Sequence, residues 1–184
     1  IYFETLLFCS SILFLNSSDN NISTINRYFL AKISLFILEM ERKKIGAGII
    51  AIDKKTGDIL LGKRSFNSNS PNTWAPFGGT FEIKDENPKN TAKREFEEET
   101  GIHSEYELSS SPFYVQEIPN LIFYSYLGIF NDKVNVTIDS SEHSNSGWFP
   151  LNSLPSNLHP GFEKLLSDKK SELEDIIENL KEKN

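Results

Sequence analysis

Cysteine is nearly absent from this chain of 184 residues, which contains Cys9 alone. A single cysteine cannot form an internal disulfide, and it excludes a metal site built from several thiolates. The three histidines are not paired at metal-ligand spacing, so the sequence does not resemble a zinc hydrolase. We therefore expect a reducing, cytoplasmic compartment.

Basic residues are in the minority, with 19 lysines and arginines against 26 aspartates and glutamates and a net charge of −7. Proteins that bind nucleic acids non-specifically need a basic surface, so no nucleic-acid partner is expected. A Gly-Lys-Ser/Thr phosphate loop is also missing, which excludes a Walker-type ATPase. An acidic protein of this kind can still bind polyphosphates when metal ions screen the charge.

Long apolar runs are missing as well, because neither of two candidate runs reaches the roughly 18 residues that span a bilayer. These runs, residues 5–15 and 28–38, lie in a first segment of 39 residues that precedes the only methionine, Met40. Three interpretations of residues 1–39 stay open: sequence translated from upstream of a natural start, a membrane anchor or targeting leader, or an additional helix. We prefer the first, which leaves residues 40–184 as the folded domain and no membrane association.

Apolar patterning outlines the elements of this domain. A buried strand is expected over 45–52, followed by a turn at 53–58 and a returning strand over 59–63. Further strands are expected over 106–117 and 121–130. An amphipathic helix is expected over 161–181, which packs on the sheet at its start, frays beyond, and offers its far half for a dimer contact.

Residues 88–100 carry the clearest local signals. Asn87 is a good N-cap, Pro88 stands at the first helical position, and Gly101 stands where a left-handed C-cap residue is favoured. The sequence therefore predicts a helix over 88–100.

Three glutamates of this predicted helix, Glu95, Glu98 and Glu99, share one side at i, i+3, i+4 spacing. Like charges at this spacing repel each other by roughly 0.2–0.5 kcal/mol per pair. Such a face is either solvated or compensated by a cation. Ligands that are all oxygen favour a hard divalent ion, Mg²⁺ or Mn²⁺, over zinc.

The stretch Arg94–Ile102, together with Glu86 eight residues earlier, resembles the second half of the Nudix hydrolase (MutT-like) signature, Arg-Glu-U-x-Glu-Glu-x-Gly-U with U apolar. The signature has a glycine six residues before its first glutamate, where this chain has Thr80, so we expect the turn at 83–85 to be one residue longer than usual. The resemblance extends loosely over 45–166. It implies an α/β/α sandwich with a mixed β-sheet.

The resemblance also implies an activity, the Mg²⁺- or Mn²⁺-dependent hydrolysis of a nucleoside diphosphate linked to another moiety. We expect a nucleoside triphosphate as substrate, with nucleotide sugars and dinucleoside polyphosphates next. The alternative class is a catalytically silent nucleotide sensor on the same fold, although the intact acidic triad speaks against it. An RNA-cap hydrolase would need a basic groove, which the composition does not indicate. The expected partner is a small-molecule nucleotide, bound by a monomer or homodimer.

Site residues follow from the same resemblance. The expected metal ligands are Glu95, Glu98, Glu99, Glu142 and the carbonyl of Gly78. The expected catalytic residues are Glu98 and Glu95, one of which takes a proton from water unless Glu142 does so, and Arg94. Arg94 is expected to orient the cluster by pairing with Glu86 or with a helix glutamate.

Four residues are candidates for substrate binding: Arg64, Gly79, Asn157 and His159. A surface ion pair is an equally good interpretation of Arg64. His143, next to Glu142, could act as an acid or base, but a histidine in a loop is more often only exposed.

Overall fold

The computed structural model describes residues 30, 32–34, 43–103 and 106–183. It divides the chain into two units, residues 1–42 and 43–184, which are taken separately. Of the first unit only residues 30 and 32–34 are described, and they are helical. The interpretations of residues 1–39 otherwise lie outside the described residues. Within the described part of the chain, every helix is too short or too polar to cross a bilayer.

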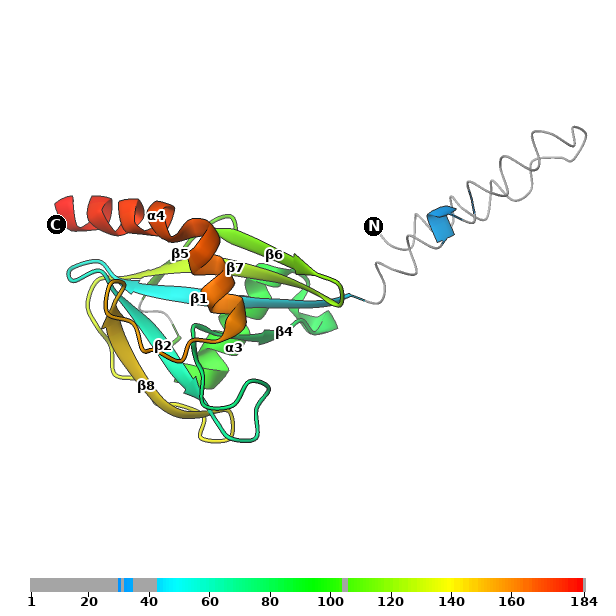
Figure 1. Ribbon diagram of the computed structural model, residues 1–184, viewed down its shortest axis with the longest axis horizontal. Coiled ribbons are helices and arrows are strands. Elements are labelled where there is room, and N and C mark those ends of the chain that lie inside the picture. Colours follow the sequence, from blue (N-terminus) through cyan, green and yellow to red (C-terminus); the bar gives the residue numbers. More distant parts are fainter. Residues whose placement is uncertain (1–29, 31, 35–42, 104–105, 184) are drawn as a thin grey trace, which may run out of the picture. The chain divides into compact units, whose positions relative to one another are not determined.

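The second unit is built on one mixed sheet of eight strands (Figure 1). The strands are β1 (Lys44–Asp53), β2 (Asp58–Arg64), β3 (Trp74–Ala75), β4 (Phe77–Thr80), β5 (Tyr106–Leu108), β6 (Tyr114–Ile118), β7 (Leu121–Phe130) and β8 (His143–Pro150). The main path runs β3-β2-β1-β7-β5, and β1 pairs with β7 in parallel along its whole length. β4, β6 and β8 add to β1, β7 and β2 respectively.

The single strand predicted over 106–117 is wrong, because two short strands occupy this stretch. β5 and β6 pair with opposite ends of β7. Between them lie three consecutive serines and Pro112, which has no N–H for a sheet ladder. The predicted hairpin of β1 and β2 is confirmed.

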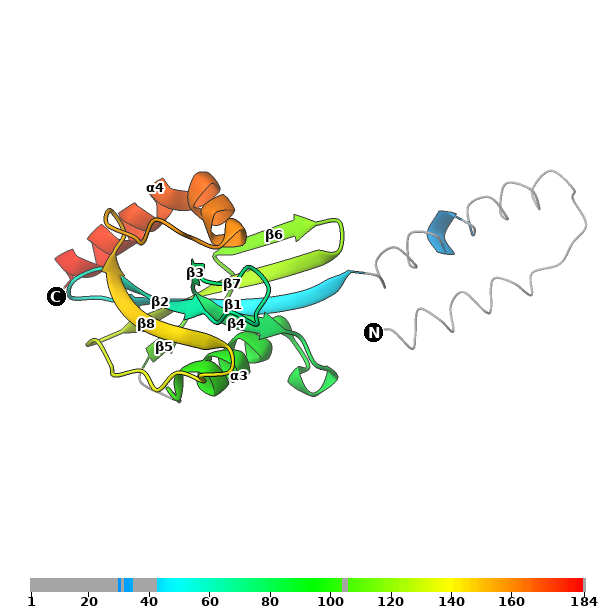
Figure 2. The ribbon, with the colours of Figure 1, turned by 60° about the horizontal axis from the view of Figure 1, so that its bottom comes forward.

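Two long helices cover the two faces of the sheet, α3 (Pro88–Thr100) on one and α4 (Pro160–Glu182) on the other (Figure 2). Alternate residues of β1 serve the two layers, as the period of a strand requires. Ile49 and Ala51 pack with α3, whereas Ile50 and Ile52 pack with α4. The predicted α/β/α sandwich with a mixed sheet is therefore confirmed.

Both helices follow their sequence signals, with one correction. The α3 caps are as predicted: the side chain of Asn87 accepts from the Asn90 amide at 3.0 Å, and Gly101 has a left-handed φ of 70°. α4 does not fray after its start, because Leu173 and Ile177 are buried and the helix continues to Glu182. The apolar stripe thus packs on the sheet over most of its length.

Candidate active site

The glycine pair of β4 lies directly against the carboxylates of α3. The Gly78 amide donates to Oε2 of Glu99 at 2.8 Å. A Cβ atom at Gly79 would lie 2.7 Å from Oε1 of Glu95, closer than real Cβ contacts come. The absence of a side chain at Gly79 therefore leaves room for the Glu95 carboxylate, while a Cβ at Gly78 would instead meet the β1 backbone at Gly48 and Ala47.

Arg94 is the centre of an ion-pair network at this edge of α3. Its Nε and Nη2 donate to Oδ1 and Oδ2 of Asp85 at 2.8 and 3.0 Å. Its Nη1 contacts Oε2 of Glu98 at 2.9 Å, and its Nη2 contacts Oε1 of Glu95 at 2.9 Å. Nη2 also donates to the carbonyl of Thr80. The predicted pairing of Arg94 with helix glutamates is confirmed.

The loop partner of Arg94 is Asp85 and not the predicted Glu86. Asp85 is buried, while Glu86 is exposed at the end of the short helix η1 (Ile83–Asp85), with φ of 65°. Asp85 follows Gly79 by six residues, so it satisfies the glycine spacing of the signature that Glu86 does not. The expectation of a longer turn at 83–85 is therefore changed in one respect. The residue that is additional relative to the signature is Glu86, which follows the turn.

Burial strongly affects two carboxyl groups of this cluster, those of Glu99 and Glu95. Burial raises the pKa of Glu99 to about 8, against the lowering effect of the Gly78 amide. The negative charges of Glu142 and Glu95 raise the pKa of Glu99 further, and the positive charge of Arg64 lowers it. Burial also raises the pKa of Glu95, against the pairing with Arg94. Glu99 is thus a desolvated acid among like charges, an environment that favours a cation.

The pairing of β2 with β8 explains how Arg64 and Glu142 reach this cluster. Arg64 is opposite His143 in the register, and the amide of Ser65 donates to the carbonyl of Glu142 at 2.8 Å. The side chain of Glu142 is exposed. Nε of Arg64 donates to the carbonyl of Asn69 at 2.7 Å, which orients the guanidinium within the loop after β2.

His143 is the residue whose environment sequence reasoning missed. The expectation of an exposed loop histidine is wrong, since the side chain is 1% exposed and begins β8. Its Nδ1 is 3.9 Å from Oε1 of Glu99, and its ring centroid is 4.8 Å from that of Phe77. Burial and the charge of Arg64 lower the pKa of His143 to about 4. The long-range pairing of β8 with β2 and the packing of the ring on Phe77 bury this residue, so no local signal could have indicated it.

Two of the predicted substrate-binding residues have structural contacts. The amide of Trp74 donates to the Asn157 carbonyl and the amide of His159 donates to the Trp74 carbonyl, both at 2.8 Å. The Asn157 side chain donates to the Asn72 carbonyl at 3.0 Å. Nδ1 of His159 accepts from the Gly161 amide at 3.0 Å and caps α4. Their predicted contact with substrate remains a prediction.

The donor chemistry of the cluster fits a divalent cation. Every candidate side chain is a carboxylate, which is the ligand type of Mg²⁺ and Mn²⁺. Buried Glu99 and partly buried Glu95 are carboxyl groups whose charged forms are disfavoured by burial. Among the described residues, no three acidic, histidine or cysteine side chains already lie close enough together to hold one metal ion. Glu95 and Glu98 are instead paired with Arg94.

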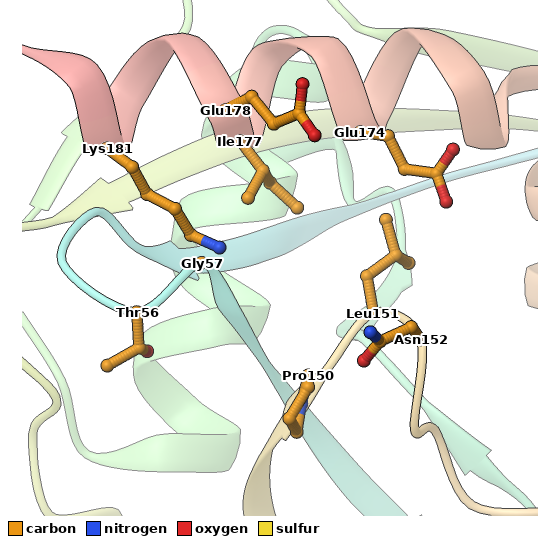
Figure 3. A pocket seen from close by; sticks show the side chains of 9 residues that line it. All are labelled: Thr56, Gly57, Pro150, Leu151, Asn152, Glu174, Ile177, Glu178 and Lys181. Carbon is orange, nitrogen blue, oxygen red and sulfur yellow. The ribbon is translucent and has the colours of Figure 1, made fainter.

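A separate cavity of about 190 Å³ borders α4 and shares no residue with the carboxylate cluster (Figure 3). It is lined by Thr56, Gly57, Pro150, Leu151, Asn152, Glu174, Ile177, Glu178 and Lys181. Its volume is below the roughly 300–1,000 Å³ of typical small-molecule sites. The carboxylate cluster therefore remains the candidate active site.

Solved structures with a similar fold include proteins described as Nudix hydrolases. The chain is similar to the Nudix hydrolase RenU from M. smegmatis, with 18% identity, a TM-score of 0.62, and 73% of this chain and 88% of that chain covered. It is similar to a C. elegans Ap4A hydrolase, with 21% identity, a TM-score of 0.59, and coverage of 71% and 98%. A MutT Nudix hydrolase from Burkholderia pseudomallei gives 21% identity, a TM-score of 0.51, and coverage of 68% and 96%.

The family itself is established by a sequence model. The model described as the NUDIX domain matches residues 42–168, which is more than half of the chain. The chain therefore belongs to the Nudix family, whose members hydrolyse pyrophosphate bonds and generally use a divalent metal ion. Among curated proteins, no sequence matches the chain significantly.

Proposed function

We propose that this chain is a Mg²⁺- or Mn²⁺-dependent hydrolase of a nucleoside diphosphate linked to another moiety, with a nucleoside triphosphate as the first candidate substrate. The observation that carries the proposal is the buried Glu99, held against the Gly78 amide among the charges of Glu95, Glu142 and Arg64. The cation would be held by Glu95, Glu98, Glu99, Glu142 and the Gly78 carbonyl.

A bound divalent ion neutralises the diphosphate, polarises phosphorus and lowers the pKa of water at the site. The protein supplies orientation. Gly78 fixes one oxygen of Glu99, and Arg94, anchored on Asp85, fixes Glu95 and Glu98. Glu98 is the exposed member of the helix triad, so among the three helix glutamates it is the one accessible to take the proton of an attacking water.

The substrate is best identified with a panel of nucleotides. Nucleoside triphosphates come first, and dinucleoside polyphosphates follow because one similar structure is an Ap4A hydrolase. Nucleotide sugars complete the panel. Mg²⁺-dependent cleavage of one pyrophosphate bond, and none with a chelator, is the expected result; it releases phosphate or pyrophosphate from a nucleoside triphosphate and two phosphorylated fragments from a dinucleoside polyphosphate or a nucleotide sugar. Binding of nucleotides without any turnover over the whole panel would contradict the proposal and favour the silent sensor.

Glu98→Gln is expected to lower the hydrolysis rate at fixed Mg²⁺ by at least about tenfold, which is a modest loss for removal of a proton acceptor. The fold is expected to stay intact, because the exposed Glu98 pair with Arg94 contributes only roughly 0.3–0.5 kcal/mol. Steady-state kinetics on the best substrate measures the effect. Glu97→Gln, one residue earlier on α3, is the matched control. An unchanged rate in Glu98→Gln would remove Glu98 from the site.

Gly79→Ala is expected to lower hydrolysis by about tenfold, because the new Cβ would displace the carboxylate of Glu95. The group displaced is the carboxylate at the flexible end of the Glu95 side chain. We therefore expect the free energy of unfolding to change by about 1 kcal/mol or less. Kinetics and urea unfolding measure the two effects. Gly147→Ala is the control, since its Cβ would meet only the ring of Phe149 at 3.1 Å. Full activity in Gly79→Ala would contradict the assigned place of Glu95.

A further inference from the structure

His143 occupies a niche that is fitted to its ring. The imidazole packs on Phe77 with an interplanar angle of 52°. Gly62, on β2, leaves the space for both rings: a Cβ at Gly62 would lie 2.5 Å from Cδ2 of His143 and 2.6 Å from Cε1 of Phe77. Because the side chain is 1% exposed, these neighbours fix how the imidazole is turned.

The fixed orientation turns Nδ1 toward the carboxylate cluster. Nδ1 is buried, and the described residues give it no hydrogen-bond partner. It is 3.9 Å from Oε1 of Glu99, whose other oxygen, Oε2, accepts from the Gly78 amide at 2.8 Å. An unpartnered buried nitrogen costs free energy, so in a native protein it calls for an explanation, and a role in a catalytic site is one of them.

We propose that His143 is a positioning residue for Glu99. The Nδ1–H of neutral His143 donates to Oε1 of Glu99, so that the carboxylate is held at one oxygen by the Gly78 amide and at the other by the imidazole. The Nδ1–Oε1 distance needs to shorten by about 1 Å to reach a hydrogen bond. This inference rests on the proposed function, because it assigns Glu99 to the binding of a divalent ion.

A residue that orients a metal-binding carboxylate affects metal affinity, typically by about 10–100-fold. A histidine that only fills the core has no such effect on metal affinity. Phenylalanine at 143 would keep an aromatic ring in the niche and remove Nδ1. Asparagine would keep an N–H close to the position of Nδ1, and glutamine would carry its amide one bond further from the backbone.

The experiment measures Mn²⁺ binding to the full chain by electron paramagnetic resonance, without nucleotide, and then kcat and KM. His143→Phe is expected to weaken Mn²⁺ binding by about tenfold or more and to lower kcat similarly, with KM for the nucleotide within about twofold. His143→Asn is expected to recover most of the Mn²⁺ affinity and His143→Gln much less. His103→Phe, at a mostly exposed histidine, is the control.

Several outcomes separate the inference from the function on which it rests. Equal Mn²⁺ binding in the wild-type chain and in His143→Phe would overturn the positioning role alone. If His143→Phe does not fold, the comparison of the asparagine and glutamine variants decides, and equal affinities in these two would also overturn it. A wild-type chain that binds no Mn²⁺ would overturn the proposed function and this inference with it.

Discussion

Glu99→Gln is expected to lower kcat for nucleotide hydrolysis at saturating Mg²⁺ by about a hundredfold or more. Glu99 is the only fully buried member of the triad, and its carboxylate is held by the Gly78 amide. Glutamine keeps an oxygen for that amide but carries no negative charge toward a cation. Losing one charged ligand removes part of the several kcal/mol that a metal ion contributes to a transition state, and each 1.36 kcal/mol of that contribution is about tenfold in rate.

The stability of Glu99→Gln distinguishes a functional carboxylate from a structural one. Burial opposes the charged form of Glu99, so replacing it with a neutral isostere is not expected to lower the free energy of unfolding by more than about 1 kcal/mol. Steady-state kinetics and urea unfolding test the two halves of the prediction. Glu97→Gln on the same helix should retain activity. A Glu99→Gln variant that is unstable but fully active when folded would show that Glu99 is structural.

Asp85→Asn is expected to lower the free energy of unfolding by about 3 kcal/mol at pH 7, the lower end of what breaking a buried ion pair costs. The side chains of Asp85 and Arg94 are only 3% and 15% exposed, and the aspartate makes two hydrogen bonds to the guanidinium. The variant leaves Arg94 without its main partner. Urea unfolding measures the loss, with Glu86→Gln, at the neighbouring exposed acid, as the control.

The pH dependence of this loss has a defined sign. The hydrogen bonds from Arg94 hold the pKa of Asp85 well below its usual value of about 3.9. A carboxyl group with a depressed folded pKa contributes stability that is fully present above the unfolded pKa and is lost as pH falls through the folded pKa. The wild-type advantage over Asp85→Asn should therefore be constant from pH 7 to about 5 and shrink below about 4. An equal or larger effect of Glu86→Gln would contradict the assignment of Asp85.

The parts that the sequence predicted well are those decided by neighbouring residues. Asn87, Pro88 and Gly101 define the ends of α3 through local backbone chemistry, and the structure has the same helix. The glutamate spacing depends only on helix geometry. The sandwich followed from the resemblance of one short motif, not from composition.

The parts that the sequence did not predict depend on contacts between distant segments. The path of the turn from β4 to α3 decides whether Asp85 or Glu86 reaches Arg94. The spacing to Gly79 favours Asp85, whereas the spacing to Arg94 favours Glu86, so the sequence alone gives two answers. His143 is buried because β8 pairs with β2 and Gly62 leaves room for its ring. Neither fact is visible in the residues next to these positions.

The most direct test of the account is a crystal of this chain soaked with Mn²⁺ and a non-hydrolysable nucleotide analogue, with anomalous scattering used to locate the ion. The account predicts manganese bound by the carboxylates of Glu95 and Glu99, with the diphosphate of the analogue on the same ion. Manganese found only elsewhere, or a bound analogue with no ion beside Glu95 and Glu99, would contradict it.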